Sequence, residues 1–136
     1  MTFTIDRIDH LVLNVADVEV SAAWYQKVLG MQREEMPGRS GPRVAMRFGR
    51  QKLNLRPVEI DQKTWFTADH PVAGSDDLCF ITEVDPASVS AHLQALGIAV
   101  EVGPIERAGA TGPMTSVYCR DPDGNLIEVS QYHAAA

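Results

Sequence analysis

The sequence predicts an α+β fold made of two similar βαβββ modules, and three observations support this prediction. A strand, turn and helix pattern at residues 9–31 returns at residues 76–98. Short strand candidates follow each helix, so the same order of elements occurs twice. A loop-like connection separates the two halves. We therefore expect one domain over residues 1–136, with module one at about 4–58, a linker at about 59–74 and module two at about 75–132.

The first half opens with a strand that leads into a helix. Asp17 stands at the N-cap position, and Gly30 stands where a left-handed residue commonly ends a helix. Apolar residues at helical spacing predict the helix between them: Val18, Ala22, Tyr25 and Leu29. The strand candidates that follow cover residues 32–35, 43–48 and 52–58.

The second half repeats this order. Asp85 is the expected N-cap, Pro86 the first helical residue and Gly97 the stop signal. Its strand candidates cover residues 99–102, 115–119 and 125–131, and the Gly-rich stretch 103–113 is predicted to be a loop. The two segments share residues at five matched positions, which indicates an internal duplication: Asp9/Asp76, Leu11/Leu78, Ser21/Ser88, Leu29/Leu96 and Gly30/Gly97.

Composition limits the kinds of partner. The formal charge is −6 and no run of lysine and arginine builds a basic face, so we expect neither nucleic acid nor an anionic membrane as a partner. No apolar stretch is long enough to span a membrane, and the first residues lack the pattern of a signal peptide. We therefore expect a cytoplasmic protein that acts on a small molecule. Cys79 and Cys119 lie inside predicted strands, which suits buried free thiols in a reducing compartment.

Polar residues occupy matched positions in the duplicated frame. The modules are expected to pack side by side, with their strands curling around a shared cleft. His10 corresponds to Asp77, and aligning KLNLR with GNLIE makes Arg56 the counterpart of Glu128. Alternation places Glu128 on one face of an apolar strand. If that face is covered, the carboxylate needs a metal, an arginine or another cation as its partner.

Four stretches carry a resemblance to a known family: DHLVLNVAD, AWYQKVLGM, RFGRQKLNL and CRDPDGNLIEVSQY. They resemble the vicinal oxygen chelate superfamily, which contains glyoxalases, fosfomycin-resistance thiol transferases, extradiol ring-cleaving dioxygenases and bleomycin-binding proteins. The likeness extends from Thr4 to Tyr132, and it is strongest to the small glyoxalase-like or virulence-associated branch. The resemblance implies an open, curved mixed sheet, a homodimer, and a divalent metal bound by first-strand and last-strand side chains and by two adjacent substrate oxygens.

Carried over residue by residue, the resemblance implies His10 and Glu128 as metal ligands. Asp77 occupies a ligand position where many members have histidine. One histidine with two carboxylates suits hard divalent ions, and the expected ion is Fe, Mn, Ni or Zn, with a metal-free cleft as the alternative. Glu128, displaced from the metal, is the expected catalytic base of a glyoxalase-like isomerisation.

Arg56 departs from the family pattern, which has a histidine or a glutamate at this position. Three interpretations of Arg56 stay open. With a neutral histidine, the two carboxylates and Arg56 sum to a single negative charge, which weakens the attraction for a dication. Alternatively, Arg56 pairs with Glu128 in a cleft without metal. In the third interpretation, Arg56 binds an anionic substrate group beside the metal.

Arg107 in the Gly-rich loop and Tyr118 near the last hairpin are the other expected substrate-binding residues. Trp65 and Phe66 in the connection are expected to be exposed and to form a lid or a dimer contact. The predicted function is a divalent-metal-dependent enzyme for a small substrate with vicinal oxygens, of the glyoxalase-like lyase or isomerase type or of the ring-cleaving dioxygenase type. The alternatives are a metal-free protein that sequesters a small molecule, as in the bleomycin-resistance type, and a dimeric scaffold.

Overall fold

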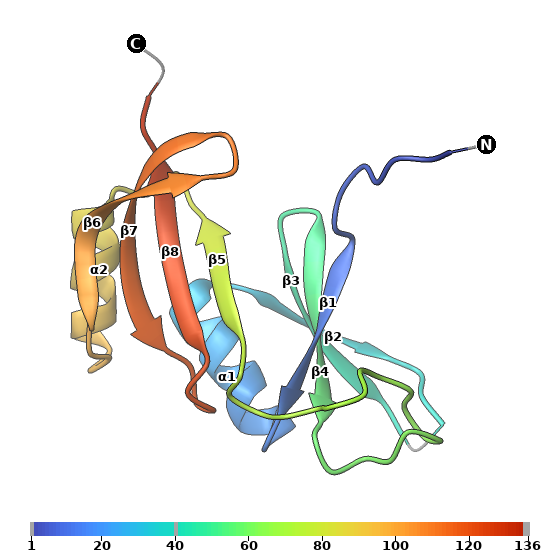
Figure 1. The fold of residues 1–136 in the computed structure, drawn as a ribbon. Coiled ribbons are helices and arrows are strands. Elements are labelled where there is room, and N and C mark those ends of the chain that lie inside the picture. Colours follow the sequence, from blue (N-terminus) through green and yellow to red (C-terminus); the bar gives the residue numbers. More distant parts are fainter. Residues whose placement is uncertain (1, 40, 135–136) are drawn as a thin grey trace. The chain divides into compact units, whose positions relative to one another are not determined.

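A computed structural model describes residues 2–39 and 41–134. The chain divides into two compact units, the first ending at Ala73 and the second beginning at Gly74. Each unit is one βαβββ module whose four-stranded sheet stays open (Figure 1). The structure thus confirms the predicted α+β fold class of two modules. No helix among the described residues is long and apolar enough to cross a membrane.

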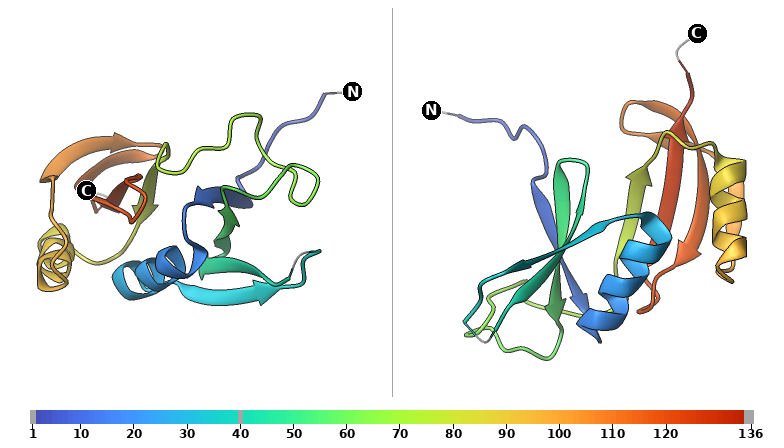
Figure 2. Two further views of the ribbon diagram at one scale, coloured as in Figure 1. Left: turned by 90° about the horizontal axis from the view of Figure 1, so that it is seen from below. Right: turned by 180° about the vertical axis from the view of Figure 1, so that it is seen from behind.

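The first unit has its sheet in the order β1-β4-β3-β2. Strand β1 runs parallel to β4, and the other neighbours are antiparallel. Helix α1 packs against one face of this sheet (Figure 2), where leucine, valine and methionine side chains of β1, β3 and β4 are buried. The elements are β1 (His10–Val15), α1 (Val18–Leu29), β2 (Gln32–Met36), β3 (Arg43–Phe48) and β4 (Gln51–Pro57).

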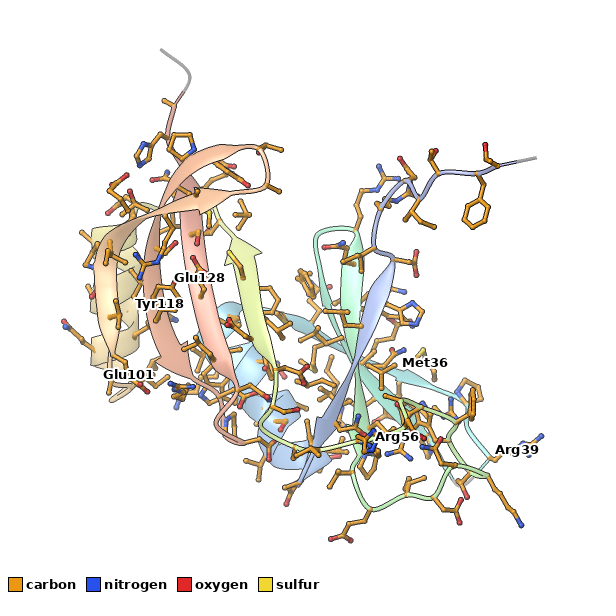
Figure 3. All side chains as sticks on the ribbon, in the orientation of Figure 1. Met36, Arg39, Arg56, Glu101, Tyr118 and Glu128 are labelled. Atoms are coloured by element: carbon orange, nitrogen blue, oxygen red, sulfur yellow. The ribbon has the colours of Figure 1, made fainter. Side chains whose placement is uncertain are left out.

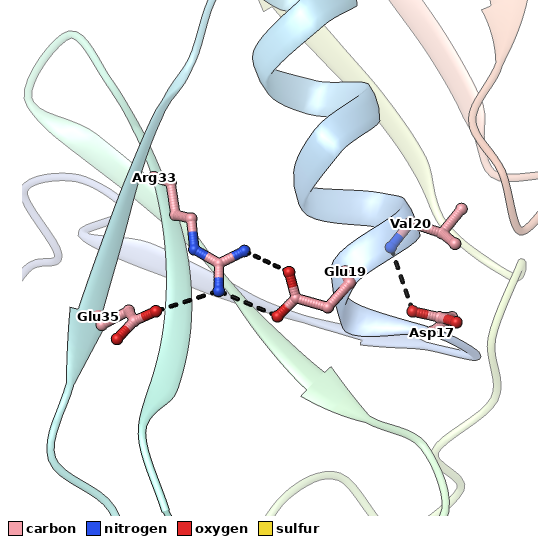
Figure 4. A network of polar contacts seen from close by, with 5 residues as sticks. All are labelled: Asp17, Glu19, Val20, Arg33 and Glu35. Carbon is pink, nitrogen blue, oxygen red and sulfur yellow. Dashed lines mark hydrogen bonds and ion pairs between the residues drawn. The ribbon is translucent and has the colours of Figure 1, made fainter.

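The start of α1 is fixed by polar contacts, which Figure 4 shows. Asp17 Oδ1 accepts a hydrogen bond from the Val20 backbone N–H at 3.1 Å, as expected of an N-cap. Arg33 on β2 donates to both oxygens of the Glu19 carboxylate, at 2.6 and 3.0 Å, and also contacts Glu35. The Arg33 guanidinium lowers the pKa of Glu19. These contacts join the first turn of the helix to β2 at the surface.

The second unit repeats the arrangement, with the sheet order β5-β8-β7-β6. Strand β5 is parallel to β8, and helix α2 packs on one face of the sheet. Asp85 caps α2 by accepting from the Ser88 N–H at 2.9 Å, so the predicted helix start is confirmed. The elements are β5 (Asp77–Ile81), α2 (Pro86–Ala95), β6 (Val102–Gly109), β7 (Gly112–Arg120) and β8 (Leu126–Tyr132).

The prediction was wrong for residues 99–101, 103–109 and 112–113. Residues 99–101 were expected in a strand and 103–113 in a loop, but β6 begins at Val102 and continues to Gly109. Strands β6 and β7 form a tight antiparallel hairpin in which Gly109 faces Gly112. An irregularity between Val102 and Ile105 shifts the register, so glycine and proline at its start mark a bulge within the strand instead of a loop.

Candidate functional site

Glu128 lies at the centre of a polar cluster on the sheet of the second unit. Its side chain projects from β8 on the face that does not carry the helix, because the neighbouring residues Ile127 and Val129 form the buried core. The Ser116 hydroxyl donates to Glu128 Oε2 at 2.6 Å, and the Ser130 hydroxyl lies 3.3 Å from the same oxygen. Both serines are almost fully buried, so the carboxylate is held in one position by hydrogen bonds from β7 and β8.

Tyr118 and Arg107 extend this cluster across β7 and β6. Tyr118 is the register partner of Glu128, and Figure 3 shows the two side chains on neighbouring strands. Arg107 Nε donates to the Tyr118 hydroxyl at 3.0 Å, and its guanidinium lies over the Tyr118 ring at 5.5 Å from the ring centre. Burial and the nearby Glu128 carboxylate raise the pKa of Tyr118, which outweighs the lowering by Arg107. Arg107, Tyr118 and Glu128, which were predicted as site residues from the sequence, therefore share one face of the sheet.

Strand β5 adds Asp77 and Cys79 to the same face. Cys79 is the register partner of Glu128, and its Sγ lies 3.4 Å from the Ser130 hydroxyl. Cys79 is exposed, which corrects the expectation that both thiols are buried, whereas Cys119 on the core side is buried. Burial raises the pKa of the Cys119 thiol to about 11. Asp77 stands at the start of β5, exposed, two residues before Cys79.

His10 begins β1 in the first unit. Its Nδ1 lies 2.9 Å from Asp9 Oδ2, and the imidazole lowers the pKa of the Asp9 carboxyl through this hydrogen bond. When Nδ1 carries the proton that Asp9 accepts, Nε2 presents a lone pair, which is the arrangement common among metal-binding histidines. The second unit has no such pair at the matching position, because Asp77 replaces the histidine there.

The strand registers change the predicted symmetry of the site. His10 pairs with Lys52 and Asp77 pairs with Leu126, so position 54 of β4 corresponds to position 128 of β8. The counterpart of Glu128 is therefore Asn54, and the alignment that gave Arg56 was wrong by two residues. A slip of two residues keeps every side chain on its own face, so alternation does not reveal it. Asn54 Oδ1 is buried and has no hydrogen-bond partner in the described residues.

Arg56 has a different place from the one that the sequence suggested. It is fully buried in the first unit, and its guanidinium donates to the Trp65 carbonyl at 3.0 and 3.2 Å and to Asn14 Oδ1 at 2.9 Å. The Ile60 carbonyl also accepts from it. These contacts fasten the connection between the units onto β1 and β4, so the Arg56 guanidinium is occupied by neutral acceptors of its own unit.

Trp65 also differs from expectation. It is buried, with 7% of its surface exposed, and the Arg43 guanidinium lies 4.1 Å from its ring centre. Both Trp65 and Phe66 were predicted to be exposed, and of the two only Phe66 is exposed. Trp65 is therefore part of the packing that holds the connection against the first unit, together with Arg56.

The donor chemistry fits a hard divalent cation. In the described residues, no three His, Cys, Asp or Glu side chains gather into a group that holds a metal. In the first unit the matched positions carry the imidazole of His10 and the amide oxygen of Asn54, and in the second unit they carry the carboxylates of Asp77 and Glu128. An amide oxygen that is buried without a donor suits a cation. Donors of these kinds are typical ligands of Mn(II), Fe(II) or Mg(II).

Known proteins are similar to this chain in fold and in sequence. The family described as the glyoxalase/bleomycin resistance protein/dioxygenase superfamily matches residues 7–129. Virulence protein STM3117 of Salmonella typhimurium is 46% identical over 128 residues, which are 94% of this chain and 85% of that protein. An integron cassette protein from the mobile metagenome of V. cholerae has a TM-score of 0.90 and 42% identity, covering 98% and 100% of the two chains. Lactoylglutathione lyase from Agrobacterium tumefaciens has a TM-score of 0.69 and 27% identity, covering 94% and 95%.

Proposed function

Because the chain belongs to the glyoxalase/bleomycin resistance protein/dioxygenase superfamily, we propose that it is a divalent-metal-dependent enzyme of the glyoxalase-like type. Its substrate is a small molecule with two adjacent oxygens. The observation that carries the proposal is the Glu128 carboxylate, held by two buried serine hydroxyls on the sheet face that does not carry α2. The likeness to a lactoylglutathione lyase favours isomerase or lyase chemistry over ring cleavage.

His10, Asp77 and Glu128 are the proposed metal ligands, and Asn54 is added as a further oxygen donor. Arg56 donates hydrogen bonds to backbone carbonyl groups. This supports the proposed ligands, because the charge of Arg56 is then not counted with theirs. Without Arg56, a neutral histidine, an amide and two carboxylates sum to two negative charges instead of one, and this balance suits a dication. When bound, the metal supplies Lewis-acid polarisation of the substrate oxygens.

Glu128 is the proposed general base. Displaced from the metal, it would take the proton from the substrate carbon that carries a hydroxyl group and return it to the neighbouring carbonyl carbon, while the hydroxyl proton passes to the former carbonyl oxygen, so the product is an isomer of the substrate. The hydroxyl groups of Ser116 and Ser130 hold the carboxylate in one rotamer through hydrogen bonds to Oε2. Tyr118 and Arg107 lie on the same face and orient the substrate through the phenol and the guanidinium.

The test is metal content. Purified tag-free protein is incubated with Mn, Fe, Ni and Zn salts, desalted, and measured by elemental analysis. We expect close to one metal per chain in the wild type and loss of that metal in Glu128→Gln. Glu83→Gln is the matched control, because Glu83 is an exposed glutamate of the same unit.

A second variant sharpens the test. Asn54→Asp replaces a neutral oxygen donor with a charged one at the position that matches Glu128, so it should tighten metal binding. Wild-type protein that stays free of metal would refute the proposal and favour the sequestering alternative, in which ligand binding is the same in EDTA. The homodimer stays a prediction of the sequence.

A further inference from the structure

A row of three basic side chains crosses the sheet of the first unit. Lys52 on β4 has His10 on β1 and Arg47 on β3 as its register partners. Register partners project from the same face of a sheet, so the three side chains stand next to one another on the face opposite to α1. We call His10, Lys52 and Arg47 the basic row.

The two outer members of the basic row have carboxylate partners. Asp9 accepts from His10 at 2.9 Å, and Glu34 forms an ion pair with Arg47. Lys52 is half-buried, and its Nζ donates to the thioether sulfur of Met36 at 3.0 Å. Among the described residues it forms no ion pair within 4.0 Å. A thioether is a weak acceptor, whereas an ammonium group offers three donors, so the central cation lacks an acceptor of matching strength.

Asn54 lies on the same face, two residues along β4. Its Oδ1 is the buried oxygen that has no donor in the described residues. Two residues along a strand are separated by roughly 7 Å, which the long lysine side chain spans. An underused donor and an unused acceptor therefore stand beside each other on one strand. A single small ligand with a carboxylate that accepts from Lys52 and a hydroxyl group that donates to Asn54 would satisfy both.

We propose that Lys52 binds the carboxylate of a small organic acid whose neighbouring oxygen group lies toward Asn54. This assigns an oxygenated carboxylic acid as the substrate class. In one interpretation of the sequence, Arg56 was the residue that binds an anionic substrate group. The assignment deepens the proposed function. It rests on the proposed function for the idea that the substrate has two adjacent oxygens, whereas binding of the carboxylate itself requires only Lys52.

The charges around Lys52 favour a carboxylate over a phosphate group. Asp9 and Glu34 are both close enough for Lys52 to influence their carboxyl groups electrostatically. They are already paired with His10 and Arg47, and each repels an incoming anion. A monoanionic carboxylate meets less repulsion there than a phosphate dianion, and it still forms a charge-assisted hydrogen bond with the ammonium group.

The three lysines of the chain allow a direct test. Lys27, Lys52 and Lys63 are reductively methylated with ¹³C, which keeps their charge, and their methyl signals are assigned with single variants. The EDTA-treated protein is then titrated with acetate, with glycolate and with the neutral diol ethylene glycol. We expect acetate and glycolate to move the Lys52 signal saturably and the diol to leave it in place. Equal movement of the Lys27 and Lys63 signals would overturn the proposal.

Variants provide a second measurement. Lys52→Met keeps the length and the contact with Met36 but removes the charge, and it should weaken glycolate binding about tenfold or more, as judged by backbone amide shifts. Lys52→Arg should retain most of the binding, and Lys63→Met, an exposed lysine, should match the wild type. Unchanged glycolate binding in Lys52→Met would refute the assignment.

The outcomes separate this proposal from the proposed function. Acetate that moves the Lys52 signal in a protein that takes up no metal would support the carboxylate site and refute the metal-dependent enzyme. A stoichiometric metal in a protein whose Lys52 signal does not respond to acetate or glycolate would support the enzyme and refute the carboxylate site.

Discussion

At the scale of single residues, Arg56 shows how one buried charge organises a loop. Its guanidinium reaches the carbonyls of Trp65 and Ile60 and the side chain of Asn14, so several acceptors depend on one side chain. The sequence identified Arg56 as exceptional because it departs from the family pattern. Its role could not be predicted, because the acceptors are backbone groups of a connection whose path the sequence does not reveal.

We predict that Arg56→Met destabilises the protein by roughly 3 kcal/mol or more, because it leaves buried carbonyl groups without donors. Arg56→Lys should recover only part of this loss, since a single ammonium group does not reproduce the forked guanidinium. Urea unfolding followed by circular dichroism measures both. The exposed Arg50 is the control, and Arg50→Met should change the free energy of unfolding by less than about 0.5 kcal/mol. Equal stability of Arg56→Met and wild type would contradict the role of Arg56.

Tyr118 offers a prediction about pH. Burial and Glu128 raise its pKa, and Arg107 lowers it. Removal of the cation in Arg107→Met should therefore raise the pKa of Tyr118 further, whereas Glu128→Gln should lower it toward the ordinary value. Titration of the tyrosine ¹³Cζ signals by NMR separates Tyr118 from Tyr25 and Tyr132. If neither substitution moves the Tyr118 midpoint, the contacts among the three residues are absent in solution.

At the scale of elements, the helices were predictable and one strand was not. Asp17 and Asp85 mark helix starts through local chemistry, because an N-cap side chain bonds to a backbone N–H three residues away. Strand β6 depends on pairing with β7, which is a tertiary contact that glycine and proline concealed in the sequence. The same limit explains the Asn54 position, since only the pairing of β1 with β4 fixes the register.

Gly103 in β6 lies close to the backbone of β7, and substitution of this glycine tests the contact between the two strands. A Cβ atom there would lie 2.4 Å from the Ser116 carbonyl oxygen, and the backbone φ is +107°. Gly97 has a φ of +73° but no atom within 4 Å of such a Cβ. Both alanine variants carry the strain of a positive φ, so we expect Gly103→Ala to be destabilised by about 2 kcal/mol more than Gly97→Ala in thermal or urea unfolding. Equal losses would show that β6 accommodates the added methyl group.

At the scale of the whole molecule, the duplication was the most informative feature of the sequence. It indicated two modules and placed His10 and Asp77 at matched positions, and each of these residues begins the first strand of its unit. Spacing was lost after the helices, where loops differ in length between the modules. The match between the last strands therefore required the structure, and with it the assignment of Asn54 in place of Arg56.

The proposed metal gives a prediction for the stability of the whole chain. At a hundred times its dissociation constant, Mn²⁺ should stabilise the protein by about 2.7 kcal/mol and raise the midpoint of urea unfolding, which far-ultraviolet circular dichroism measures. Glu128→Gln should abolish the rise, whereas Glu83→Gln should preserve it. A rise that survives in Glu128→Gln would show that the metal binds without Glu128, and the ligand set would then have to be sought among other residues.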